Sequence, residues 1–445
     1  MTEKQFTSLP VKRVFRSVAI PSVFSMVFSS LYMMADGIFV GRFIGEHALA
    51  AVNLVMPIAM ILFALSNMIA VGSSVKVSTA LGEGNIQKAR QLFSASVLMI
   101  VGLGCIFTVL GLFFTEPLIF TLIKDPALAE PAYRYVRVFT ISFPFIMPLF
   151  AMDNFLRACG KAKYSMWVNI LVSVLNVGLD WLLLAKLGLG IEFSALASVV
   201  SMFLGALFSF FPFFTKKITL HFARPKITFA EVVGIVYNGA SEFFSSVAGS
   251  FMAAFTNAFL LHLGGAIAVA SYGIVMYIDT LLLGILYGVL DSVQPAVSYN
   301  LGAGEVSRTF SFFKISCLTT AVLSAICLGG ILLFPEFLAG IFSKESSGEI
   351  IDMTVAALVL FAPSYLFTWY NMVTSSFLTA MDKPRESMLI MTFRAILFPL
   401  LCLLGLTKLL GVYGVFLTAT VSGGMTFVVA LVIWKKAEKQ YKLAA

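Results

Sequence analysis

The chain reads GEHALAAVNLVMPIAMILFALSNMIAVGSSVKVSTALGEGNIQKARQLF at residues 45–93 and GAIAVASYGIVMYIDTLLLGILYGVLDSVQPAVSYNLGAGEVSRTFSFF at residues 265–313. Aligned without a gap, the two stretches are identical at thirteen of 49 positions, and the loops LGEG (81–84) and LGAG (301–304) coincide. A shift of 222 then places FLRACGKAKYSM (155–166) on FLTAMDKPRESM (377–388). One nearly constant offset across several apolar segments predicts an internal duplication.

The composition indicates a membrane protein. Of the 445 residues, 60% are hydrophobic and only 12% are charged, whereas a soluble domain is roughly 25% charged. This balance excludes a soluble globular enzyme, a disordered chain and a nucleic-acid-binding protein. The net charge of +8 comes largely from basic residues in short loops between apolar runs, a distribution typical of contact with a membrane surface.

Twelve apolar runs are long enough to span a bilayer, which takes about 20 residues each. They lie at 16–43, 53–80, 92–115, 132–157, 164–186, 193–214, 231–262, 267–300, 309–334, 350–379, 386–409 and 412–434. With the N-terminus inside, 22 of the 30 Lys and Arg residues fall in inner segments. Because cytoplasmic loops carry the excess of basic residues, we expect both termini to be cytoplasmic in the cell (inner) membrane.

The basic stretch after residue 214 divides the chain into two halves of six spans. We therefore expect a six-helix bundle over 1–214, a cytoplasmic linker over 215–230 and a second bundle over 231–445. Since six is an even number, both halves insert in the same orientation. Parallel repeats of this kind are typical of transporters whose halves rock against each other around a central site.

Carboxylates inside the spans are costly and must face protein or water. In the first half two of them end polar stripes at helical spacing. These stripes are Ser22, Ser25, Ser29, Tyr32 and Asp36, and Asn169, Ser173, Asn176 and Asp180. Two carboxylates in one apolar pocket favour a shared proton or a bound cation such as Na⁺, with Asn and Ser198 oxygens completing the shell. Pro21 frees a backbone carbonyl, so we expect a bend there.

The second half carries further candidates. Glu242 and Asp291 are a candidate second site for a proton, a cation or a substrate, and Arg394 is a possible partner of Glu242. Aromatic and Met surfaces suit bulky apolar cations. The candidate substrate cleft comprises Tyr32, Met276, Asp279, Tyr365 and Trp369. On the helix that ends the fourth span, Asp153 precedes Arg157 by four residues, so the two are expected to pair.

Several chemistries lack their motifs. The sequence contains no GxxxxGK[ST], no GxSxG and no HExxH, so neither ATP use nor hydrolysis is indicated. No two of the three His residues are spaced to share a metal. We expect no enzyme and no resident cofactor, with Na⁺ or H⁺ serving only as a coupling ion.

These segments resemble the multidrug and toxic compound extrusion family, within the superfamily that also holds flippases for lipid-linked saccharides. The resemblance is carried by DGIFVGRFIGEHALAAVN at 36–53, NVGLDWLL at 176–183, VQPAVSYNLGAGE at 293–305 and the two FL segments quoted above. It implies twelve helices in two bundles around a V-shaped cleft. It also implies a monomer that exports organic cations and drugs in exchange for Na⁺ or H⁺.

The resemblance also implies residue roles. The family's coupling-cation residues fall on Asp36, Asn176, Asp180 and Ser198, where Ser stands in place of the family's Thr. Glu242 matches a Glu that some members use. An Asp that other members carry on the tenth helix is absent here. The alternatives are a flippase for a lipid-linked precursor, a membrane-embedded enzyme and a structural membrane protein.

Overall fold

The computed structural model describes residues 2–215, 218–342 and 348–444, and within these ranges the chain contains helices and no strands. Residues 216 and 217 of the predicted linker lie outside the described part. The helices of the first half are α1 (Gln5–Ser8), α2 (Val11–Phe39), η1 (Val40–Ile44), α3 (Glu46–Gly82), α4 (Ile86–Leu122), α5 (Pro126–Ile146), α6 (Pro148–Ala158), α7 (Ala162–Asp180), η2 (Trp181–Lys186) and α8 (Ile191–Phe214).

The second half begins with α9 (Phe229–Gly302), which is followed by α10 (Val306–Leu333), α11 (Pro335–Phe342), α12 (Gly348–Phe361), η3 (Ala362–Ser364), α13 (Tyr365–Ala380), α14 (Pro384–Thr392), η4 (Phe393–Leu397), α15 (Phe398–Leu410) and α16 (Val412–Ala444). Eleven helical segments of the described chain are long and apolar enough to cross a membrane. Gly265 interrupts the 74-residue α9 with a φ of 65° and a ψ of −160°. Counting its two parts separately gives the twelve predicted spans.

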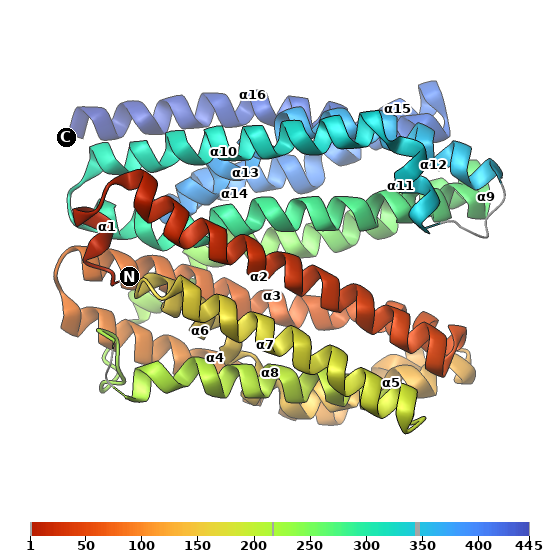
Figure 1. Ribbon diagram of the computed structural model, residues 1–445, viewed down its shortest axis with the longest axis horizontal. Coiled ribbons are helices and arrows are strands. Elements are labelled where there is room, and N and C mark those ends of the chain that lie inside the picture. Colours follow the sequence, from red (N-terminus) through yellow and green to blue (C-terminus); the bar gives the residue numbers. More distant parts are fainter. Residues whose placement is uncertain (1, 216–217, 343–347, 445) are drawn as a thin grey trace.

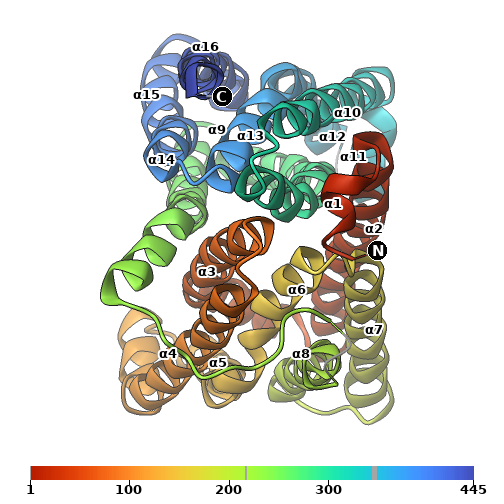
Figure 2. The ribbon, with the colours of Figure 1, turned by 90° about the vertical axis from the view of Figure 1, so that its left-hand side faces the viewer.

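The two halves lie side by side with their helices nearly parallel to the long axis (Figure 1). Both chain termini lie at one end, which we call the termini end, together with the loops after α3 and α9. At the termini end the halves are close together, and toward the opposite end their ribbons diverge (Figure 1). Helix α2 lies at the seam, between α7 of its own half and α10 of the other (Figure 2).

Equivalent aromatic side chains build the same core cluster in each half. Phe93 stacks on Phe213 with ring centroids 4.9 Å apart and meets Phe155 edge-on at 5.0 Å. In the second half Phe313 stacks on Trp434 at 3.5 Å and meets Phe377 edge-on at 5.3 Å. Aromatic pairs of these geometries contribute about 0.5–1.5 kcal/mol beyond the area they bury. The sequence duplication is therefore also a duplication of packing.

The turns repeat as well. Gly84 has a φ of 77° and its repeat equivalent Gly304 has a φ of 76°. Both follow the end of a long helix, where a left-handed residue closes the last turn and glycine alone adopts it without steric cost. These two loops end α3 and α9 at the termini end.

Glycines let the halves touch through their backbones. A Cβ on Gly82 would lie 2.1 Å from the carbonyl oxygen of Tyr299, and a Cβ on Gly302 would lie 2.2 Å from that of Thr79. In the repeat, Gly82 corresponds to Gly302 and Thr79 to Tyr299. The contact between α3 and α9 is therefore pseudo-symmetric, as in a two-fold interface. It holds the termini end closed.

Candidate functional site

The first-half carboxylates meet inside the bundle, near the end opposite the termini. Asp36 comes from the last turn of α2 and Asp180 from the last residue of α7. The exposed fraction is 8% for Asp36 and zero for Asp180. The two carboxyl groups are close enough to interact directly with each other. Ser194, at the start of α8, donates a hydrogen bond of 2.9 Å to Asp36 Oδ1.

Oxygen atoms without hydrogen-bond donors gather beside this pair. Asn176 Nδ2 donates to Ser198 Oγ at 2.9 Å, which leaves Asn176 Oδ1 free. Among the described residues, that atom and both carboxylate oxygens of Asp180 are buried without a partner. Leaving buried acceptors unpaired is costly. The structure therefore pairs Asp36 with Asp180, and it pairs Asn176 with Ser198 one helical turn before Asp180 on α7.

The donors present suit a hard cation or a proton. Hard cations take oxygen ligands from carboxylates, amides and hydroxyls, and these are the groups that Asp36, Asn176, Asp180 and Ser198 supply. Within the described ranges no group of three or more His, Cys, Asp or Glu side chains is placed to hold a metal ion. None of the ion pairs recorded in those ranges includes Asp36 or Asp180.

Sequence reasoning missed one neighbour of the site. Tyr135, on α5, is 1% exposed and lies within electrostatic range of Asp36, Asp180 and Tyr32. Tyr135 lies in an amphipathic helix rich in aromatic residues, where its spacing is the same as that of ordinary core residues. No signal in the sequence therefore distinguished it as part of a site. Helical spacing also could not show that Ser194, and not Ser198, bonds Asp36.

Asp36 also faces the space between the halves. It lines a cavity of about 300 Å³ together with side chains of α3 and of the second half of α9. Four methionines shape this cavity: Met33, Met34, Met56 and Met60. Methionine side chains are flexible and polarizable and so adapt to differently shaped apolar ligands. A single carboxylate therefore connects the buried oxygen cluster to an adaptable inter-bundle cavity.

Further charges meet deeper in the molecule. Glu242 and Asp291, both on α9, lie within electrostatic range of each other, and Arg394 lies near Glu242. Asp291 also faces Arg157, a residue of the first half that is 4% exposed. The predicted pair of Asp153 with Arg157 is confirmed. Arg157 is therefore a buried basic residue near these carboxylates, in addition to Arg394.

The second-half candidates separate into two groups. Met276 and Asp279 line a cavity of about 290 Å³ inside that half, together with Arg394. Tyr365 is 1% exposed and donates a 2.5 Å hydrogen bond to Asp279 Oδ1, so in this conformation it is a core residue and not a wall of the cleft. Trp369 is half-buried and packs edge-on against Tyr370 at 5.4 Å. Tyr32 is half-buried beside Asp36.

The helix around Pro21 is continuous. Helix α2 extends unbroken from Val11 to Phe39 with Pro21 buried inside it. The helix is therefore not interrupted at Pro21, and the bend expected there stays a prediction.

Two ion pairs join the halves at the termini end. Lys76 of α3 pairs with Asp382, and Lys88 of α4 pairs with Glu231 of α9. Asp382 also accepts a 2.8 Å hydrogen bond from Asn238. Each pair is partly exposed, and such pairs contribute only about 0–1 kcal/mol. They add to the glycine contacts that close this end.

Comparisons with known proteins agree with this geometry. The MatE family model matches the sequence twice, over residues 21–182 and 243–404. Multidrug export protein MepA of Staphylococcus aureus (strain MSSA476) is 26% identical over 436 residues, covering 96% of this chain and 94% of that protein. The protein of that name from Staphylococcus haemolyticus (strain JCSC1435) is 27% identical over 379 residues, covering 83% of each.

Solved structures share the architecture. A crystal structure of MATE in complex with MaL6 superposes with a TM-score of 0.93 at 22% identity, covering 99% of this chain and 98% of that one. An outward-facing multidrug resistance MATE family transporter gives 0.92 at 22% identity, covering 98% of both chains. At this identity the likeness shows the fold: an all-helical, multi-pass membrane protein with two repeated halves.

Proposed function

This chain belongs to the MATE family, and from that premise we propose that it is a secondary active exporter that exchanges cationic, amphipathic drugs for Na⁺ or H⁺. The observation that carries the proposal is the double role of Asp36. Its carboxylate belongs to the buried oxygen cluster with Asp180 and also lines the methionine-rich cavity between the halves. Coupling ion and cargo then act on the same negative charge.

The exchange follows from competition at that charge. A cation that enters beside Asp36 and Asp180 offsets one negative charge of the pair, and the cavity loses part of its attraction for a cationic drug. Release of the cation restores the charge and with it the affinity for cargo. Inward movement of one positive charge supplies about 2.3 kcal/mol per 100 mV. Outward movement of a singly charged cationic drug costs the same amount, so a one-for-one exchange is driven by the concentration gradient of Na⁺ or H⁺.

Rocking of the halves gives access from alternate sides. We assign the termini end to the cytoplasm from the distribution of basic residues, and the glycine contacts and ion pairs close that end. The site near Asp36 then faces the outside. In the inward-facing state the α3–α9 contact must separate, and a bend of α2 at Pro21 would contract the cavity beside Asp36.

The balance of interior charge favours cationic cargo over a diphosphate lipid. Of the interior charges named above, six are acidic (Asp36, Asp153, Asp180, Glu242, Asp279 and Asp291) and two are basic (Arg157 and Arg394). Arg157 is already paired with Asp153. A flippase for a lipid-linked precursor needs an excess of basic groups to hold the diphosphate.

Dye efflux tests this proposal. Proteoliposomes containing the purified chain are loaded with a fluorescent organic cation, and Na⁺ and pH gradients are imposed separately. We expect one gradient to drive efflux and Asp36→Asn to abolish it while the protein still inserts. Asp352→Asn is the matched control, since Asp352 is exposed on α12. Full transport by Asp36→Asn, or transport insensitive to both gradients, contradicts the proposal.

A further inference from the structure

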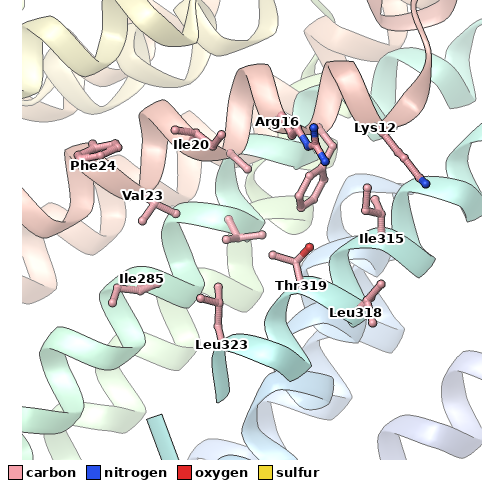
Figure 3. A pocket seen from close by; sticks show the side chains of 13 residues that line it. Lys12, Arg16, Ile20, Val23, Phe24, Ile285, Ile315, Leu318, Thr319 and Leu323 are labelled. Carbon is pink, nitrogen blue, oxygen red and sulfur yellow. The ribbon is translucent and has the colours of Figure 1, made fainter. Parts of the chain in front are cut away.

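An apolar groove follows the seam between the halves, away from the cation site. It has a volume of about 590 Å³ and lies between α2, α9 and α10 at the termini end (Figure 3). Its walls are mainly aliphatic and aromatic: Ile20, Val23, Phe24, Ile285, Leu318 and Leu323. Ile20, Phe24 and Leu318 are each more than half exposed, so the groove is open to the surroundings of the helices.

Basic side chains gather at one end of this groove. Lys12 and Arg16 lie at its mouth (Figure 3). A second hollow of about 580 Å³ shares Lys12, Arg16 and Ile20 and adds Arg13 and Lys163. All four basic side chains are exposed, and none takes part in an ion pair recorded for the described residues. Two positive charges therefore line the groove and two more line the adjoining hollow, with no ion pair to an acidic side chain recorded among the described residues.

The distances along α2 match one leaflet of a bilayer. Arg16 and Phe24 are eight residues apart, which is about 12 Å along a helix. The hydrocarbon core is about 30 Å thick, so one leaflet contributes about 15 Å. With the basic cluster at the membrane–water boundary, the apolar wall extends through most of that leaflet. The start of α2 adds backbone N–H groups whose dipole favours an anion.

We propose that this groove binds an anionic phospholipid, with its phosphate between the basic side chains and one acyl chain lying along α2 and α10. The charge pattern selects this occupant. A cationic drug would be repelled by Lys12, Arg13, Arg16 and Lys163, and a zwitterionic lipid would leave their net charge unbalanced. Arg and Lys bind phosphate through charge-assisted hydrogen bonds.

The bound lipid would bridge the two halves. Beside the groove α2 and α9 approach closely, since a Cβ on Gly288 would lie 2.8 Å from the Cα of Val23, which lines the groove. An occupant that touches both α2 and α10 binds this closed arrangement and not one in which the helices separate. By mass action it stabilises the conformation described here.

Native mass spectrometry of the full chain with dioleoyl phosphatidylglycerol or dioleoyl phosphatidylcholine tests the proposal directly. We expect preferential retention of phosphatidylglycerol. Each removed charge should weaken binding about fivefold, so Lys12→Gln with Arg16→Gln should lower the association constant roughly 25-fold. The matched control is Lys435→Gln with Lys436→Gln, which removes two exposed charges from α16 and should change binding less than twofold.

Ile20→Trp tests the apolar part without altering the charge. It fills the groove from an exposed position, and we expect it to weaken phosphatidylglycerol binding while the thermal unfolding midpoint stays near that of the parent protein. Equal retention of both lipids overturns the proposal. So does undiminished binding in Lys12→Gln/Arg16→Gln or in Ile20→Trp, or an equal loss in the α16 control, which would indicate diffuse surface attraction. None of these outcomes depends on transport activity.

Discussion

Replacing Gly82 or Gly302 by Ala should open the termini end. The added Cβ would lie 2.1 Å or 2.2 Å from a backbone carbonyl oxygen of the other half, and a backbone atom cannot turn aside as a flexible side chain does. Overpacking of this kind costs about 1–3 kcal/mol. Because the strain exists only while the halves touch, it shifts the closed-to-open ratio by roughly 5- to 150-fold.

Pulsed electron paramagnetic resonance measures this shift. Spin labels at Gln87→Cys and Ser307→Cys, in a chain with its five native cysteines replaced, report the separation of two exposed repeat-related sites at the termini end. We expect a longer distance to gain population in Gly82→Ala and in Gly302→Ala.

The control is Gly102→Ala on α4, where a Cβ would meet nothing within 4 Å. It should leave the distance distribution unchanged and slightly stabilise the helix. If the Gly82 and Gly302 variants keep the parent distribution, the backbone contact between α3 and α9 is not what closes this end.

Two further substitutions test single hydrogen bonds. Ser194→Ala removes the donor to Asp36 and should weaken the apparent affinity for the coupling cation about tenfold, since a hydrogen bond to a charged group contributes about 1.5–3 kcal/mol. The control is Ser201→Ala, which should not weaken this affinity because the Ser201 hydroxyl bonds only backbone carbonyls. Equal effects of the two substitutions on ion-dependent efflux would contradict this reasoning. Tyr365→Phe removes the hydroxyl that donates a 2.5 Å hydrogen bond to Asp279 and should destabilise the second half by about 1.5–3 kcal/mol. A lower midpoint of thermal unfolding in detergent measures this loss. An unchanged midpoint would show that water replaces the donor.

Periodicity and duplication in the sequence were enough to predict the architecture. A bilayer demands long apolar helices whose backbone bonds are satisfied internally, so span number follows from composition. The predicted boundary between the seventh and eighth spans falls beside Gly265, where the long helix α9 breaks. The polar stripes ending at Asp36 and Asp180 also predicted inward-facing carboxylates, because an acid facing lipid is too costly.

Contacts between elements distant in sequence were decided only by the tertiary structure. Helical spacing shows which residues share a face, but it does not show which faces meet. Helical spacing could not show that Ser194 donates to Asp36 or that Tyr135 lies beside both carboxylates. Nor could it show that the Tyr365 hydroxyl donates to Asp279. The groove beside Lys12 likewise forms where α2 meets α9 and α10 of the other half, and Gly288 permits the close approach of α2 to α9. Sequence periodicity specifies the helices, whereas their mutual packing, which depends on the shapes of many side chains at once, creates the sites.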